Sequence, residues 1–119
     1  MFSQRLLDHF EHPHNAGELP GATVKVEVSN PVCGDILQLA AIVDQGTVRE
    51  IRFLCRGCTA SIACASYLTQ SIQGRELREL SSVSPDALAA ALDGLPDASF
   101  HAAQLASDAL QALLRAAEK

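Results

Sequence analysis

The chain has 119 residues, of which 48% are apolar and 19% charged, so we expect a single globular domain over residues 1–119 with a hydrophobic core. A net charge of −5 without any lysine and arginine cluster argues against nucleic-acid binding, because phosphate recognition needs a basic surface. No apolar stretch approaches the roughly 20 residues that cross a bilayer, and the first residues lack the apolar run of a signal peptide, so we expect no membrane association and a cytoplasmic location with reduced cysteines.

The first half of the chain predicts one short helix followed by three strands. Apolar residues recur at helical spacing in residues 2–10, and two prolines and two glycines in the following segment end that helix. Three later segments are rich in β-branched and apolar residues, and the second and third are joined by a short turn that contains Gly46. We therefore expect a small antiparallel meander, with strands at 23–29, 36–43 and 48–54.

The second half of the chain predicts three helices. The first starts after Cys58, with Thr59 as the expected N-cap, and stops at Gly74. The second has Ser84 at its N-cap and Gly94 beyond its end, and a linker over residues 95–100 separates it from the last helix. The expected helices cover residues 59–74, 84–94 and 101–119. The fold class is therefore α+β, with a three-stranded antiparallel sheet packed against several helices.

Two of the four cysteines lie in segments where the sequence constrains the backbone conformation, namely a turn and an expected helix start. Cys33 lies in the turn NPVCGD, and Cys58 follows Gly57 at an expected helix start. The positive end of the helix dipole and the nearby Arg56 both stabilise a thiolate at Cys58, which favours metal binding or sulfur chemistry. The alternative is that both thiols are small buried apolar groups, and the local pattern leaves the two interpretations open.

The remaining cysteines and the histidines carry weaker signals. Cys55 forms a C-x-x-C pair with Cys58, a spacing that can chelate a metal, but a position at a strand end would turn its side chain into the core. Cys64 borders the apolar stripe of the first long helix, so we expect it to pack. Three further histidines crowd six residues near the N-terminus, and we expect them to be solvated or to cap the helix. These are His9, His12 and His14.

Four segments carry a family resemblance: FSQRLLDHFEHPHNAG, NPVCGD, GCTASIACAS and GRELREL. In this order and spacing they resemble the U-type iron–sulfur cluster assembly scaffold, the IscU/NifU N-terminal family. The resemblance runs from about Phe2 to the final helix, and NPVCGD is its most specific piece. It implies an α+β fold, in agreement with the pattern of strands and helices above.

The resemblance also implies a site and a function. Members of this family receive sulfur from a cysteine desulfurase, bind iron or zinc, and build a [2Fe–2S] cluster that passes to client or carrier proteins. By position, Cys33, Asp35, Cys58 and His101 match the family's first cysteine, aspartate, second cysteine and histidine. The resemblance therefore implies a binding and transfer protein, not a turnover enzyme, with these four residues around a transient cluster or an iron ion.

The chain departs from the family pattern at its third cysteine, which is Ala102 here. The family's chaperone-docking motif LPPVK reads LPDAS, with Ser99 in place of the lysine. The four remaining ligands are enough for tetrahedral zinc or ferrous iron, with Cys55 as a further candidate. Three hypotheses follow: a cluster scaffold, a zinc-containing acceptor that takes a persulfide on Cys58, and a zinc-stabilised interaction module. A homodimer in which a second chain supplies the missing ligands is a further expectation.

Overall fold

The computed structural model describes residues 1–31 and 34–118. Its strands form one antiparallel sheet in the order β1-β2-β3, which confirms the predicted meander. In the register, Val26 of β1 lies opposite Leu39 of β2, which lies opposite Phe53 of β3. The sheet therefore presents a continuous apolar row on one face, as the alternation in the sequence requires. The strands are β1 (Val24–Ser29), β2 (Ile36–Asp44) and β3 (Thr47–Arg56).

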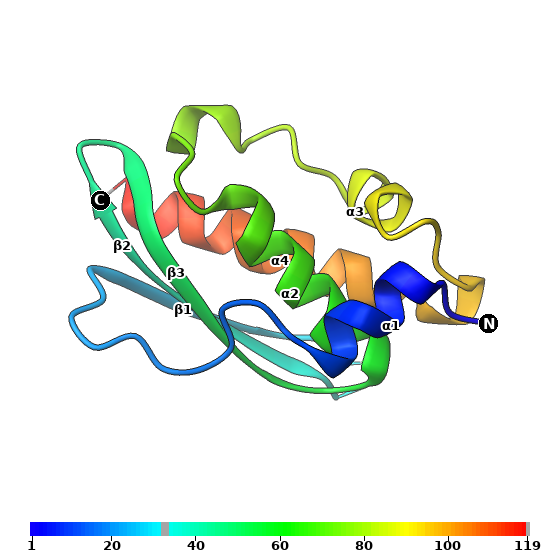
Figure 1. Cartoon of the computed structure of the whole chain (residues 1–119). Helices are drawn as coiled ribbons and strands as arrows, with labels where there is room; N and C mark the ends of the chain where they lie inside the picture. The colour runs from blue at the N-terminus through cyan, green and yellow to red at the C-terminus, as the bar shows by residue number, and fades with distance from the viewer. Residues whose placement is uncertain (32–33, 119) are drawn as a thin grey trace.

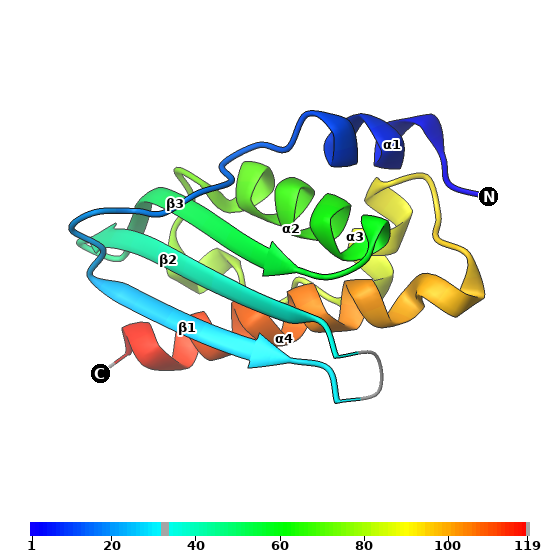
Figure 2. The ribbon, with the colours of Figure 1, turned by 90° about the horizontal axis from the view of Figure 1, so that it is seen from below.

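The helices cover that apolar face. In Figures 1 and 2, α2 and α4 run along the sheet. Helix α1 lies beside α2, and α3 lies near the N-terminal end of α4. Ser3 caps α1 by accepting a hydrogen bond from the Leu6 amide, and Ser84 caps α3 by accepting one from Ala87. The described helices are α1 (Gln4–Glu11), α2 (Thr59–Ile72), α3 (Pro85–Ala91) and α4 (Phe100–Ala117), with 3₁₀ turns η1 (Leu77–Glu79) and η2 (Asp97–Ser99).

The core lies between the sheet and helices α2 and α4. Leu68 of α2, Leu110 of α4 and Leu39 of the sheet are fully buried, and Phe53 of the sheet is buried beside them. Cys64 is also fully buried in this cluster, as expected for a packing residue, and burial raises the pKa of its thiol to about 12. Truncating a core leucine to alanine typically costs about 2–5 kcal/mol, so this contact between the layers stabilises the packing of α2 and α4 on the sheet.

Three local expectations need correction. Helix α2 begins at Thr59, but its N-cap is Cys58, which has the extended backbone that a cap requires, and not Thr59. The segment 95–100 is not a bare linker, because it holds η2 and the first residue of α4. The apolar spacing after Cys58 predicts that Ile62 lies on the buried stripe of α2, but it is only half-buried against the core.

No helix in the described part of the chain is both long enough and apolar enough to cross a membrane.

Candidate metal centre

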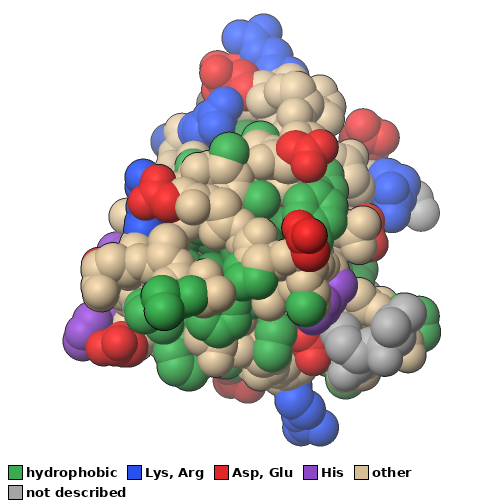
Figure 3. Space-filling view, turned by 90° about the vertical axis from the view of Figure 1, so that its right-hand side faces the viewer, with side chains coloured by type: hydrophobic (Ala, Val, Ile, Leu, Met, Phe, Trp, Pro, Cys, Tyr) green, Lys and Arg blue, Asp and Glu red, His purple; other side chains and the backbone are tan. Residues whose placement is uncertain are grey.

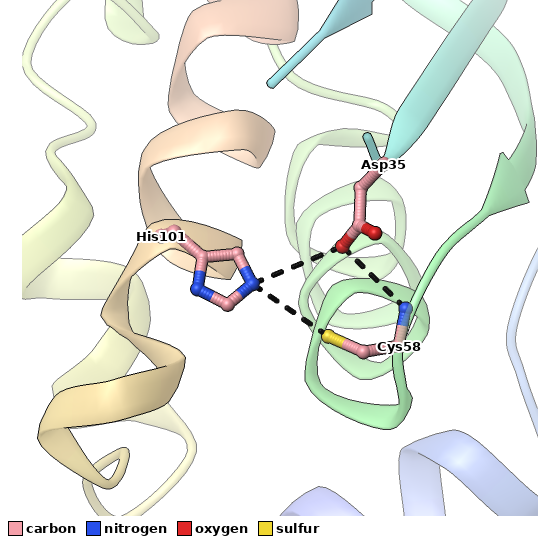
Figure 4. Close-up of side chains that lie close together, drawn as sticks. All are labelled: Asp35, Cys58 and His101. Carbon is pink, nitrogen blue, oxygen red and sulfur yellow. Dashed lines mark hydrogen bonds and ion pairs between the residues drawn. The ribbon is translucent and has the colours of Figure 1, made fainter. Parts of the chain in front are cut away.

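Three side chains from distant segments converge at one end of the molecule (Figure 4). Asp35 directly precedes β2, Cys58 is the N-cap of α2, and His101 is the second residue of α4. A carboxylate oxygen, the thiol sulfur and an imidazole nitrogen all lie within 4.8 Å of one another. The fourth residue of the implied set, Cys33, lies outside the described residues. The fold thus brings together every described member of that set.

Cys58 is held at the surface by the join between β3 and α2. The strand ends at Arg56, Gly57 makes the turn, and Cys58 opens the helix with its thiol exposed. Its Sγ lies 3.8 Å from Nε2 of His101. Cys58 is therefore the most accessible nucleophile and ligand of the group.

Asp35 is the buried member of the group, with 7% of its surface exposed. Its Oδ2 accepts a hydrogen bond of 2.5 Å from the Ser61 hydroxyl and a longer one, 3.5 Å, from the Cys58 backbone N–H. Both donors belong to the start of α2, where backbone N–H groups have no partner within the helix, so the beginning of this helix holds the carboxylate. The carboxylate is thereby fixed at the base of the site, beneath the thiol.

Gly57 leaves the space that this carboxylate occupies. A Cβ at Gly57 would lie 2.8 Å from Cγ and 2.9 Å from Oδ2 of Asp35, which is closer than real contacts allow. Only a residue without a side chain therefore lets the backbone of the turn approach the carboxylate in this way.

His101 presents a defined ring nitrogen to the site. Its Nδ1 lies 3.2 Å from the carbonyl oxygen of Ala98, and because a carbonyl can only accept, Nδ1 is the nitrogen that carries the hydrogen. In the neutral ring, Nε2 then keeps its lone pair, and it faces Cys58 Sγ at 3.8 Å and Asp35 Oδ2 at 3.9 Å. A backbone carbonyl that fixes the opposite ring nitrogen is the usual support of a metal-binding histidine.

The donor atoms suit one ion of zinc or ferrous iron. Around a tetrahedral zinc, bond lengths of about 2.3 Å to sulfur and 2.0 Å to nitrogen put the two donors about 3.5 Å apart. The sulfur and nitrogen of Cys58 and His101 are separated by 3.8 Å, so a small closing movement would bring them onto one ion. Thiolate, imidazole and carboxylate together match borderline metals, not calcium or magnesium.

Cys55 is not brought into this group of described residues. It pairs with Leu37 in the β2–β3 register and packs against the core from the inner face of the sheet. Burial, followed by the charges of Asp35 and Cys58, raises the pKa of its thiol to about 12. A thiol with such a pKa stays protonated near neutrality, which is unfavourable for a ligand. Ala102, which follows His101, is also buried in the core.

The expectation for the N-terminal histidines is wrong at His9. Its ring is 7% exposed, and Nδ1 lies 2.8 Å from Ser66 Oγ of α2, whereas His12 and His14 are exposed. Burial, then the charges of His14 and Arg5, lowers the pKa of His9 below 6.5, with Asp8 acting in the opposite direction. His9 therefore serves to dock α1 on α2 and is not part of the metal centre.

Two residues of the site were missed by sequence reasoning: Gly57 and Ser61. Ser61 carried one weak signal, because it lies three residues after Cys58 and so on the same first turn of α2. Gly57 appeared only as the residue before a cysteine. Their roles depend on Asp35, which is more than 20 residues away, and only the tertiary fold shows it.

The comparisons with known proteins agree on one family. The sequence profile of the NifU-like N-terminal domain matches residues 1–118. The iron–sulfur cluster assembly scaffold protein IscU 1 of Archaeoglobus fulgidus is 38% identical over 111 residues, which cover 93% of this chain and 72% of that protein. The scaffold protein IscU of Escherichia coli K12 is 32% identical over 117 residues, covering 95% of this chain and 91% of that protein.

Solved structures show the same fold. A crystal structure described as a putative iron–sulfur cluster assembly scaffold protein for the SUF system, from Fervidobacterium islandicum AW-1, superposes with a TM-score of 0.74. The match covers 95% of this chain and 96% of that one at 18% identity. The N-terminal part of a nitrogen-fixing NifU-like protein from Brucella abortus gives a TM-score of 0.66 at 19% identity, over 97% of this chain and 81% of the other.

Proposed function

Because the chain belongs to the family of NifU-like N-terminal domains, we propose that it is an iron–sulfur cluster assembly scaffold. In this role it binds iron, accepts sulfur from a cysteine desulfurase, builds a [2Fe–2S] cluster and passes the cluster to a client or carrier protein. The observation that carries the proposal is the convergence of Asp35, Cys58 and His101 in a chain whose relatives are named as such scaffolds.

Each residue has a distinct task in this proposal. Cys58, exposed at the N-cap of α2, attacks the outer sulfur of the desulfurase persulfide and releases the desulfurase thiol. An external two-electron reductant then frees this sulfur as sulfide, and the Cys58 thiolate ligates iron. His101 offers Nε2, and Asp35 offers a carboxylate that α2 holds in place. Cys33 is proposed as the fourth ligand from its motif alone. A cluster held by only two thiolates is bound less tightly than one held by four, and weak binding suits a cluster that has to be released.

The surface around the centre supports a role in transfer between proteins. On the end of the molecule shown in Figure 3, hydrophobic side chains lie among acidic ones, and most basic side chains lie toward the margin. We propose that the desulfurase and the recipient protein dock in turn on this end of the molecule. Zinc is the proposed alternative occupant of the metal centre. A homodimer around a shared cluster is proposed as well. A cytoplasmic location stays a prediction.

Anaerobic reconstitution tests the proposal. The chain is mixed with ferrous iron, cysteine, a cysteine desulfurase and excess dithiothreitol, which supplies the electrons that convert persulfide sulfur to sulfide. We expect visible sulfur-to-iron charge-transfer absorption with matching iron and sulfide contents. The Cys58→Ser variant should stay colourless. Cys64→Ala is the matched control, because it removes a thiol that is buried away from the centre, and it should still form the cluster. A colourless wild-type protein with intact thiols would refute cluster assembly.

Two other outcomes identify the alternatives. A zinc-containing persulfide acceptor would gain a mass of about 32 Da, one sulfur atom, on Cys58 without forming a cluster. A zinc-stabilised interaction module would bind zinc tightly and acquire neither colour nor sulfur. Metal analysis and intact-mass spectrometry on the same samples separate these outcomes from the scaffold.

A further inference from the structure

Ser61 touches two residues of the candidate centre from inside the protein. It lies in the first turn of α2, and only 2% of its surface is exposed. Its Oγ donates a 2.5 Å hydrogen bond to Asp35 Oδ2 and lies 3.3 Å from Cys58 Sγ. A buried hydroxyl whose neighbours are two candidate ligands is in the place where a residue can orient them without binding the ion.

Among the described residues of the centre, Ser61 makes the shortest contact with Asp35 Oδ2. The Cys58 backbone N–H is 3.5 Å away, at the limit of a hydrogen bond, and Nε2 of His101 is 3.9 Å away, which is beyond it. A hydrogen bond weakens as the distance between its donor and acceptor atoms grows. The Ser61 hydroxyl is therefore a stronger restraint on this oxygen than the Cys58 N–H.

Gly57 and Ser61 hold the carboxylate from two directions. The backbone of Gly57 approaches so closely that a Cβ there would overlap the carboxylate, while Ser61 binds its Oδ2. Ser61 and Cys58 belong to the same helix start, three residues apart. The hydroxyl thus links the residue before β2 to the element that carries the thiol, and it fixes the carboxylate relative to that thiol.

From this arrangement we infer that Ser61 is a positioning residue of the metal centre, acting through Asp35. This inference rests on the proposed function in so far as it takes Asp35 as a ligand. The hydrogen-bond partners of a ligating carboxylate commonly change the metal affinity by about 10- to 100-fold. They hold the carboxylate in place beforehand, so the carboxylate loses less conformational freedom when the metal binds. Ser61 does so here from a place that a sequence pattern does not mark.

A double-mutant cycle with zinc alone tests the inference. Zinc dissociation constants are measured anaerobically, with a chromophoric competitor, for wild type, Ser61→Ala, Asp35→Ala and the double variant. We expect Ser61→Ala to weaken zinc binding by about 10- to 100-fold. In the Asp35→Ala background, the same change should have little further effect. Equal losses in both backgrounds, or no loss in wild type, would overturn the inference.

Cobalt substitution adds a readout that a general packing defect would not move. The d–d bands of bound Co²⁺ report coordination number, and Ser61→Ala should change them in the same direction as Asp35→Ala does. Ser61→Thr keeps the hydroxyl and should restore the wild-type spectrum. An unchanged Co²⁺ spectrum in Ser61→Ala would also overturn the inference.

Matched controls separate this inference from the proposed function. Ser71→Ala removes a hydroxyl from the other end of α2, where it bonds to the Leu68 carbonyl, and should leave zinc binding unchanged. Thermal melting of every variant shows which ones fold. If Ser61→Thr does not fold, the double-mutant cycle still decides whether Ser61 acts through Asp35. A wild-type chain that binds no zinc would overturn both the centre and the role of Ser61. A wild-type chain that binds zinc yet forms no cluster would refute only the scaffold.

Discussion

Gly57 gives the plainest example of how one residue controls the centre. The turn from β3 into α2 passes so close to Asp35 that a single added carbon would overlap the carboxylate. Gly57 does not adopt a positive φ, so its backbone conformation is open to other residues. The requirement for glycine at this position therefore comes from the neighbouring side chain, and not from the turn itself.

The Gly57→Ala variant should consequently damage the site. The added Cβ forces the buried carboxylate of Asp35 away from its hydrogen bond with Ser61, which should lower the unfolding free energy by about 1–3 kcal/mol. We expect a chain that still folds, with a lower melting temperature and with zinc affinity weakened at least as much as in Ser61→Ala. Zinc competition titrations and melting curves on the same preparation check both parts. Unaltered zinc affinity in a folded Gly57→Ala protein would contradict this account of Asp35.

The residues of the site were predictable to different degrees. A motif resemblance marked Cys58, Asp35 and His101 as candidates, and the fold brings one donor atom of each within 4.8 Å of the others, while their role as ligands stays a prediction. Ser61 and Gly57 were not found, because a serine in a first helical turn and a glycine before a helix have many ordinary explanations. Their importance comes from contacts with a residue far away in the sequence, which no local pattern encodes.

At the scale of elements, α1 is attached to α2 through a buried polar contact. His9 of α1 is 2.8 Å from Ser66 Oγ, and the same hydroxyl accepts a hydrogen bond from the His14 backbone N–H. The ring of Tyr67 meets His9 edge-on, with centroids 5.8 Å apart. The docking of α1 and of the segment after it thus depends on a histidine that is buried in its neutral form.

Acid should therefore weaken the docking of α1. The pKa of His9 in the folded chain lies below its ordinary value of 6.5, so the unfolded chain binds the proton more readily. The contribution of His9 to stability is complete above about pH 6.5 and is lost as the pH falls through the lower pKa of the folded state. When the pH is lowered from about 8 through 6.5 to 5, the urea concentration at the unfolding midpoint should fall less in His9→Gln than in wild type.

The matched control for this prediction is His12→Gln. His12 is the exposed C-cap of α1, so its removal should leave the pH dependence of the urea midpoint close to that of wild type. Identical pH dependence in wild type and His9→Gln would show that His9 does not link protonation to stability.

The regular elements were largely predictable, because their apolar residues repeat with the period of a strand or a helix. In the part of the chain that the structure describes, the three strands and four helices lie within a few residues of their predicted places. The 3₁₀ turns η1 and η2 were missed, since three residues are too few to show a period. The N-cap of α2 was misplaced by one residue, because threonine is the commoner cap and Cys58 has no side-chain cap hydrogen bond.

At the scale of the whole molecule, the centre joins three separate parts of the fold. Asp35 leads into β2, Cys58 begins α2, and His101 lies in the first turn of α4. All three meet at the end of the molecule away from the β2–β3 hairpin (Figure 2). An ion bound there crosslinks the sheet to both of the helices that cover it, so metal binding should stabilise the entire chain.

Zinc should accordingly raise the melting temperature. A ligand that binds only the folded state at 100 times its Kd adds about 2.7 kcal/mol, which corresponds to a rise on the order of 10 °C for a chain of this size. Differential scanning calorimetry with and without zinc should show this rise in wild type and in Cys64→Ala, but not in Cys58→Ser. A rise of the same size in Cys58→Ser would place the zinc elsewhere on the protein.

Zinc-edge X-ray absorption of the loaded protein tests most directly whether these side chains share one ion. We predict a mixed shell with sulfur at about 2.3 Å and nitrogen or oxygen at about 2.0–2.1 Å. The sulfur contribution should fall in Cys58→Ser, and the imidazole scattering should disappear in His101→Ala. A wild-type shell without sulfur, or the same shell in all three proteins, would contradict the convergence of Asp35, Cys58 and His101 on one metal.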